Sequence, residues 1–193
     1  NLLLPDLRGH GQSEGEYIGM GWHDRLDIIE WINYIIKDDK NANIMLHGVS
    51  MGAGTVTMVS GENLPKNVKG IIADCGYTSA WDQFSYQLKT IFNLNEFPIM
   101  QVSDLFAKMK AGYSIKDASA INQVKKSDIP ILYIHGDKDT FVPYYMMKEL
   151  YDATPSKEKQ MVTVKGAKHA KSSEVNPKLY WESIYNFTKE HMN

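Results

Sequence analysis

The sequence contains a single cysteine, Cys75, so no disulfide can form within the chain and the fold does not depend on oxidation. Charge of either sign is hardly in excess, because 21 Lys and Arg residues face 23 Asp and Glu residues. This balance gives no electrostatic reason to expect nucleic acid or an anionic membrane as a partner. No apolar run approaches the roughly 18–20 residues of a membrane span, and no signal-peptide pattern opens the chain.

The chain of 193 residues suits one globular domain with a substantial core. Short apolar runs have the length of β-strands and lie at residues 2–4, 44–46, 70–73, 131–134 and 161–164. Most are continuous rather than alternating, as expected for parallel strands covered by helices on both faces. Helical periodicity occurs between them, at residues 24–37, 53–60, 144–153 and 178–191. The alternation predicts an α/β fold with a mainly parallel sheet.

Residues 75–128 interrupt this alternation, because they contain no convincing strand pattern. Two helical patterns lie there, at residues 81–92 and 102–110, and Pro98 separates them. Connections of this length are usually functional or form an inserted subdomain. We therefore predict one domain over residues 1–193 with a helical insert at 75–128.

The pattern Gly-x-Ser-x-Gly occurs twice, around Ser50 and around Ser13. It has chemical meaning where a strand enters a tight turn and then a helix, since the turn raises the serine hydroxyl above the sheet edge. Ser50 follows a buried-strand pattern and precedes small helical residues, whereas Ser13 lies in a polar loop. We predict that Ser50 is a nucleophile and that the Ser13 hydroxyl bonds nearby backbone.

A serine hydroxyl is a weak nucleophile unless a base takes its proton and an acid orients that base. In α/β proteins, catalytic groups gather at the carboxyl ends of strands. Asp137 and Asp139 follow the run at 131–134, and His169 follows the last run. The order Ser50, Asp, His169 therefore predicts a triad in which the two aspartates compete for the acid role. His135 also follows a strand, but its place beside a glycine favours a structural or pocket-lining role.

Four motifs in this order resemble those of the α/β-hydrolase family. Residues 5–13 resemble the loop after the family's fourth strand, 48–52 its nucleophile elbow, 139–143 its acid loop and 166–169 its histidine loop. The finer resemblance is to bacterial serine aminopeptidases and BEM46-like hydrolases. The resemblance selects Asp139 over Asp137, because two residues separate the family's acid from a Val-Pro pair.

This resemblance implies a serine hydrolase that cleaves an ester or related acyl bond of a small-molecule substrate through an acyl-enzyme. His169 would take the Ser50 proton, Asp139 would orient the imidazole, and the Met51 N–H would donate to the oxyanion. The insert at 75–128 lies where a lid often covers the family's active site. Its aromatic residues would either line an apolar acyl or aryl pocket or simply pack the insert against the sheet; they are Trp81, Phe84, Tyr86, Phe92, Phe97 and Phe106.

The sequence predicts neither a metal nor a cofactor. It has no His-Glu-x-x-His pattern and no close His and Asp cluster outside the acid loop. It also lacks the glycine-rich patterns that bind dinucleotides and nucleoside triphosphates. Cys75 is expected to be a small buried residue rather than a reactive thiol.

The chain begins with Asn1 rather than methionine, and residues 2–4 look like the middle of a strand. If they form the family's fourth strand and residues 44–46 its fifth, the family's third strand should lie between them. That strand and a second oxyanion donor would precede Asn1, so we expect about 80–110 further N-terminal residues. The visible sequence predicts a cytoplasmic protein, and membrane anchoring or a surface location stays open because their signals would precede Asn1.

Two other functions remain open from the sequence. An aminopeptidase or acylpeptidase needs an acidic pocket for the substrate amine, and Asp82, Glu96 or Asp104 of the insert could supply it. A catalytically silent binding module would have the same motifs without activity.

Overall fold

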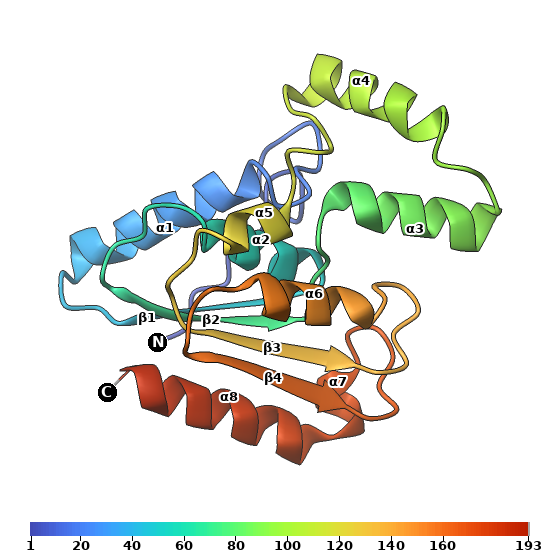
Figure 1. Cartoon of the computed structure of the whole chain (residues 1–193). Coiled ribbons are helices and arrows are strands. Elements are labelled where there is room, and N and C mark those ends of the chain that lie inside the picture. The colour runs from blue at the N-terminus through green and yellow to red at the C-terminus, as the bar shows by residue number, and fades with distance from the viewer. Residues whose placement is uncertain (193) are drawn as a thin grey trace.

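The computed structural model describes residues 1–192, and a four-stranded parallel sheet lies at its centre (Figure 1). The strands are β1 (Ile44–Val49), β2 (Val68–Asp74), β3 (Ile131–Gly136) and β4 (Lys159–Val164), and they pair in the order β1-β2-β3-β4. Each strand extends one of the predicted apolar runs by two or three residues. The prediction of an α/β fold with a parallel sheet is confirmed.

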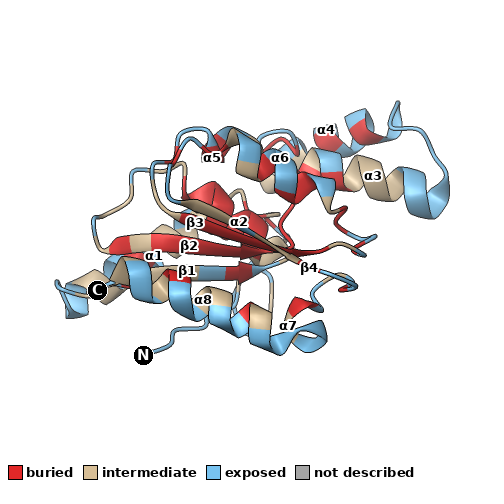
Figure 2. Ribbon diagram, turned by 60° about the horizontal axis from the view of Figure 1, so that its bottom comes forward, coloured by how far each residue is buried: buried red, intermediate tan, exposed pale blue. Residues whose placement is uncertain are grey.

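Helices cover both faces of the sheet, which explains why β2 and β3 at its centre are largely apolar and buried. On one face, Ile71 and Tyr133 pack in a core with α2 (Met51–Val59) and α6 (Tyr145–Ala153). On the other face, Ile72 and Leu132 pack with α8 (Pro177–Met192). Figure 2 shows the largely buried β2 and β3 between helices whose outer surfaces are exposed.

The helical periods predicted four of the helices outside the insert. The structure has α1 (Asp24–Asp38), α2, α6 and α8, with ends that differ from the predictions by no more than two residues. The short helix α7 (Ser172–Val175) was not predicted, because a single turn has no periodicity to detect. No helix among residues 1–192 combines the length and the apolar character needed to cross a membrane.

The chain between β2 and β3 forms α3 (Ala80–Phe92), α4 (Ile99–Ala111) and the short α5 (Ala120–Val124). Ser79 caps α3 by accepting a hydrogen bond from the Asp82 N–H, and a bridge between Ser79 and Ser119 joins the two ends of the insert. Helices α3 and α4 form a hairpin that extends away from the sheet (Figure 1).

The prediction of a strand at residues 2–4 is wrong. These residues have no strand pairing, and the side chains of Leu2 and Leu4 are 83% and 80% exposed. An apolar run becomes a strand only where a neighbouring strand accepts its backbone hydrogen bonds, and the first strand of the sheet, β1, pairs only with β2. The segment instead lines an open groove of about 1080 Å³ together with α1 and β1.

Candidate active site

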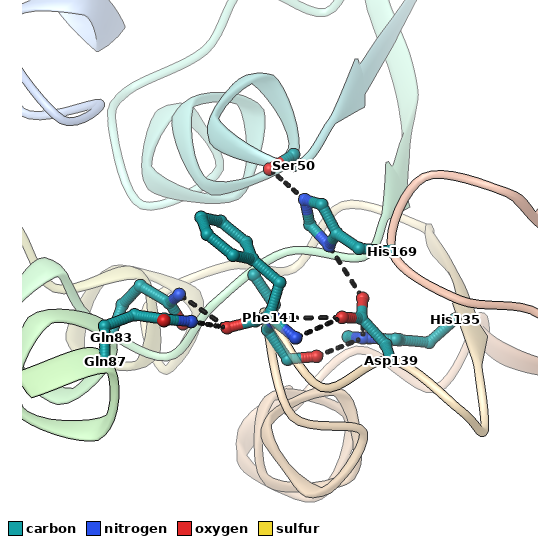
Figure 3. A network of polar contacts seen from close by, with 8 residues as sticks. Ser50, Gln83, Gln87, His135, Asp139, Phe141 and His169 are labelled. Atoms are coloured by element: carbon teal, nitrogen blue, oxygen red, sulfur yellow. Dashed lines mark hydrogen bonds and ion pairs between the residues drawn. The ribbon is translucent and has the colours of Figure 1, made fainter. Parts of the chain in front are cut away.

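The carboxyl ends of the parallel strands bring together three side chains that are far apart in the sequence. Ser50 follows β1, Asp139 follows β3 and His169 follows β4. The Ser50 Oγ lies 2.7 Å from the His169 Nε2, and the His169 Nδ1 lies 2.7 Å from the Asp139 Oδ2 (Figure 3). Because an ionised carboxylate only accepts hydrogen bonds, the His169 Nδ1 carries the proton and its Nε2 is free to accept one from Ser50.

Ser50 lies in a strained turn between β1 and α2. Its φ is 55° and its ψ is −114°, a conformation that non-glycine residues rarely adopt. A Cβ on Gly48 would lie 2.1 Å from the Gly52 carbonyl oxygen, so only glycine allows the strand and the helix to approach this closely. Met51 is the first residue of α2, and the first N–H groups of a helix have no partner within it. Met51 thus places a backbone N–H at the N-terminus of α2, the end of a helix that favours negative charge, directly after Ser50 in the chain.

The Asp139 side chain is completely buried, yet both of its oxygens have hydrogen-bond donors. Oδ1 accepts from the Phe141 and Val142 N–H groups at 2.9 Å each, and Oδ2 accepts from His169 and His135. Burial by itself raises the pKa of Asp139, but these hydrogen bonds outweigh it and hold the pKa well below its usual range. The carboxylate is therefore ionised at neutral pH and can stabilise a protonated His169.

His135 contacts the Asp139 carboxylate, a role that the sequence did not indicate. Its side chain is fully buried, and its Nε2 lies 3.1 Å from the Asp139 Oδ2 and 2.9 Å from the Val142 carbonyl oxygen. Both partners are acceptors, so the Nε2 carries the proton. The only sequence feature that could have indicated this contact is the spacing of four residues between His135 and Asp139. Such a spacing is common, and it indicates a contact only when the conformation of the loop is known.

The competing candidates have other partners. The Asp137 carboxylate accepts from the Gly166 N–H at 2.6 Å, and the Ser13 hydroxyl donates to the Asp6 carbonyl at 2.7 Å within its own loop. The remaining histidines, His10, His23, His47 and His191, contact Arg8, Tyr17, Tyr180 and Glu158 respectively.

Cys75 lies beside the Asp139 and His169 pair. The ligand atoms of the three residues all lie within 4.8 Å of one another, so these are the side chains in the described part of the chain that could hold a metal ion. Cys75 is buried, and this burial raises the pKa of its thiol far above its usual range, so the thiolate that a metal prefers is hard to form. The absence of a metal stays a prediction.

The aromatic residues of the insert do not gather in one pocket. Trp81 and Phe84 pack against the core, whereas Phe92, Phe97 and Phe106 are exposed. Tyr86 lines a cavity of about 350 Å³ between α3 and α6; it shares this cavity with Thr78, Asp82, Ser85, Tyr145 and Glu149.

The three acidic residues considered for amine binding are held by different partners. Asp82 accepts from the Thr78 hydroxyl, and Glu96 accepts from the Trp81 indole N–H. Asp104 is buried and pairs with Lys108 and the Ser114 hydroxyl. Of these three, only Asp82 lines the cavity, together with Glu149, which the sequence did not single out.

The sequence profile of the prolyl oligopeptidase family matches residues 3–193 of this chain. The Bacillus subtilis protein YqkD is 28% identical over 195 residues, which cover 100% of this chain and 63% of that protein. The chain thus spans about three fifths of the length of such curated relatives.

Two solved structures have the same fold. An esterase from Pyrococcus furiosus aligns with a TM-score of 0.73 and 22% identity, over 97% of this chain and 70% of its own. An acylaminoacyl peptidase from Pyrococcus horikoshii aligns with a TM-score of 0.65 and 15% identity, over 89% of this chain and 28% of its own. The fold is that of the α/β-hydrolases.

Proposed function

The chain belongs to the prolyl oligopeptidase family, and we propose that it hydrolyses an ester or related acyl bond through Ser50, His169 and Asp139. One observation carries the proposal: an unbroken line of hydrogen bonds runs from the Ser50 hydroxyl through the His169 ring to the buried Asp139 carboxylate. This is the arrangement that a serine needs to become a nucleophile.

The proposed reaction has two halves. His169 takes the Ser50 proton while the Ser50 Oγ attacks the carbonyl carbon, and the Met51 N–H stabilises the oxyanion. The tetrahedral intermediate collapses to a serine ester and releases the alcohol, which receives the proton from His169. Water then loses a proton to His169 and attacks this ester; the carboxylic acid leaves and Ser50 regains its proton. One oxyanion donor contributes about 2.7–4 kcal/mol in such a transition state.

In this proposal the insert at residues 75–128 acts as a lid over a small-molecule acyl substrate. The exposed Phe92, Phe97 and Phe106 of the hairpin support this role, because an acyl or aryl group could pack against them.

Labelling by a fluorophosphonate probe tests the mechanism. We expect the wild-type protein to be labelled and Ser50→Ala to lose labelling and esterase activity. The second Gly-x-Ser-x-Gly motif offers a matched control, since Ser13→Ala removes a loop hydroxyl and should leave labelling unchanged. Equal labelling of Ser50→Ala and wild type would disprove the role of Ser50, and an unlabelled wild-type protein would favour a silent binding module.

An aminopeptidase or acylpeptidase activity is the alternative. The cavity lined by Asp82 and Glu149 favours it, because two carboxylates that line the same cavity suit a substrate amine. Kinetics on p-nitrophenyl esters and on amino-acid p-nitroanilides separate the two activities. Faster turnover of the anilides would replace the esterase proposal by the peptidase one.

A further inference from the structure

Two glutamine side chains of the hairpin converge on one backbone carbonyl of the acid loop. Gln83 and Gln87 lie four residues apart on α3, so their side chains share a face of that helix. The Gln83 Nε2 donates to the Phe141 carbonyl oxygen at 2.7 Å, and the Gln87 Nε2 donates to the same oxygen (Figure 3). The acid loop is thereby attached to a helix that lies more than 50 residues earlier in the chain.

Phe141 also contacts both Asp139 and His169. Its N–H donates to the Asp139 Oδ1 at 2.9 Å. Its ring lies against the His169 ring, with 4.8 Å between the ring centroids. The backbone and side chain of this single residue therefore connect α3 to the carboxylate and to the imidazole.

Gln83 is an unusual residue for its position. It is only 4% exposed, and its Oε1 has no hydrogen-bond partner among the described residues. Burying an amide with one unsatisfied oxygen is unfavourable, so an apolar side chain would stabilise this position better if packing were its only role. An apolar side chain would lack the Nε2–H group with which Gln83 donates a hydrogen bond to the Phe141 carbonyl oxygen.

We propose that Gln83 and Gln87 are positioning residues, which hold Phe141 and through it the alignment of Asp139 with His169. This proposal rests on the proposed function of the triad. It makes α3 part of the support of the reaction centre as well as part of a lid. A misplacement of about 1 Å in a catalytic group can slow a reaction by about 100-fold. An anchor connected to Asp139 through two hydrogen bonds and the Phe141 backbone therefore affects the rate without contacting the substrate.

The test uses the double variant Gln83→Leu/Gln87→Leu, which keeps the side-chain size and removes both donors. Gln101→Leu is the matched control, because Gln101 is exposed on α4 of the same hairpin. We expect kcat to fall by about 10–100-fold in the double variant, with KM nearly unchanged. The loss should be the same for p-nitrophenyl acetate and for p-nitrophenyl octanoate, since a positioning role is independent of acyl length.

The pH profile gives a second readout. If the Asp139 carboxylate is less well aligned, it stabilises the imidazolium less, so the acid limb of kcat/KM should shift to lower pH. A variant that is merely less folded loses rate equally at all pH values and keeps its limb in place. The single variant Gln87→Leu repeats both measurements at a less buried position, in case the double variant does not fold.

Four outcomes would overturn the positioning role or the proposed function on which it rests. A fall in kcat confined to the octanoate ester would mean that the glutamines contact substrate. A fall in kcat with an unmoved acid limb of kcat/KM would mean that they only support folding. Either result overturns the positioning role. Activity equal to that of Gln101→Leu would overturn it as well. A wild-type protein that neither reacts with fluorophosphonate nor cleaves either ester overturns the proposed function itself, and the positioning role with it.

Discussion

The Asp139 carboxylate accepts four hydrogen bonds, and only one of them comes from the histidine that would act as the base. Two come from the backbone of its own loop, and the fourth comes from His135. This contact requires a proton on the His135 Nε2, and the His135 Nδ1 has no hydrogen-bond partner among residues 1–192. At the scale of the residue, the position and the ionised state of the Asp139 carboxylate therefore depend on its own loop backbone and on His135 as well as on His169.

His135→Phe and His135→Gln make this role measurable. Phenylalanine removes the donor and leaves Asp139 with one hydrogen bond fewer in a buried site, which costs about 1.5–3 kcal/mol. Glutamine retains an N–H donor and should recover part of the loss. We expect the order wild type, Gln, Phe in both the free energy of unfolding and kcat/KM, measured by urea denaturation and ester hydrolysis. A phenylalanine variant as active and as stable as wild type would contradict this.

At the scale of the element, glycines set how closely the loops approach one another. Gly48 lets β1 meet α2 around Ser50, and Gly136 plays the same part at the end of β3. A Cβ on Gly136 would lie 2.2 Å from the Ala167 carbonyl oxygen, which belongs to the loop that contains His169. The acid loop and the histidine loop can therefore contact each other only if residue 136 has no side chain.

Gly136→Ala is expected to separate these two loops. The clash is with backbone, which cannot rotate away, so the strand end and the loop must move apart and lengthen the contact between Asp139 and His169. Overpacking of this kind costs about 1–3 kcal/mol. We expect a lower midpoint of thermal unfolding and a larger proportional loss of activity than of folded protein, measured by circular dichroism and ester hydrolysis. Unchanged activity at an unchanged midpoint would show that the loops adjust freely.

Elements were predictable from the sequence where they are long or periodic. The helical period of α1 and the short apolar runs within β1 to β4 can be recognised in a few consecutive residues. The five-residue α5 and the four-residue α7 are too short to show a period. The prediction of a strand at residues 2–4 was wrong for a different reason. A run of three leucines has a strand-like composition, but no strand lies beside it to pair with.

At the scale of the whole molecule, the burial of an ionised carboxylate links folding to pH. The pKa of Asp139 is lower in the folded state than the value of about 3.9 expected in an unfolded chain. The folded state therefore holds its proton more weakly, and the resulting stabilisation is fully present above about pH 5. It is lost as the pH falls below that value.

Asp139→Asn should remove this pH dependence. We expect the variant to be less stable than wild type at pH 7 by about 1–3 kcal/mol, and the difference to shrink as the pH falls from 5 to 3. Asp137→Asn is the matched control, since Asp137 is less buried and its carboxylate accepts a hydrogen bond from the Gly166 N–H. Urea denaturation at several pH values measures both. A constant difference between wild type and Asp139→Asn across this range would disprove the linkage.

The sequence by itself determined the α/β class, the parallel sheet and the order in which Ser50, Asp139 and His169 occur along the chain. These are properties of short segments and of chain order, so they can be read without coordinates. Only the tertiary structure decided that His135 bonds Asp139 and that Gln83 and Gln87 reach Phe141 from 58 and 54 residues away. Contacts of this kind depend on how the insert packs against the sheet, and no local pattern encodes that packing.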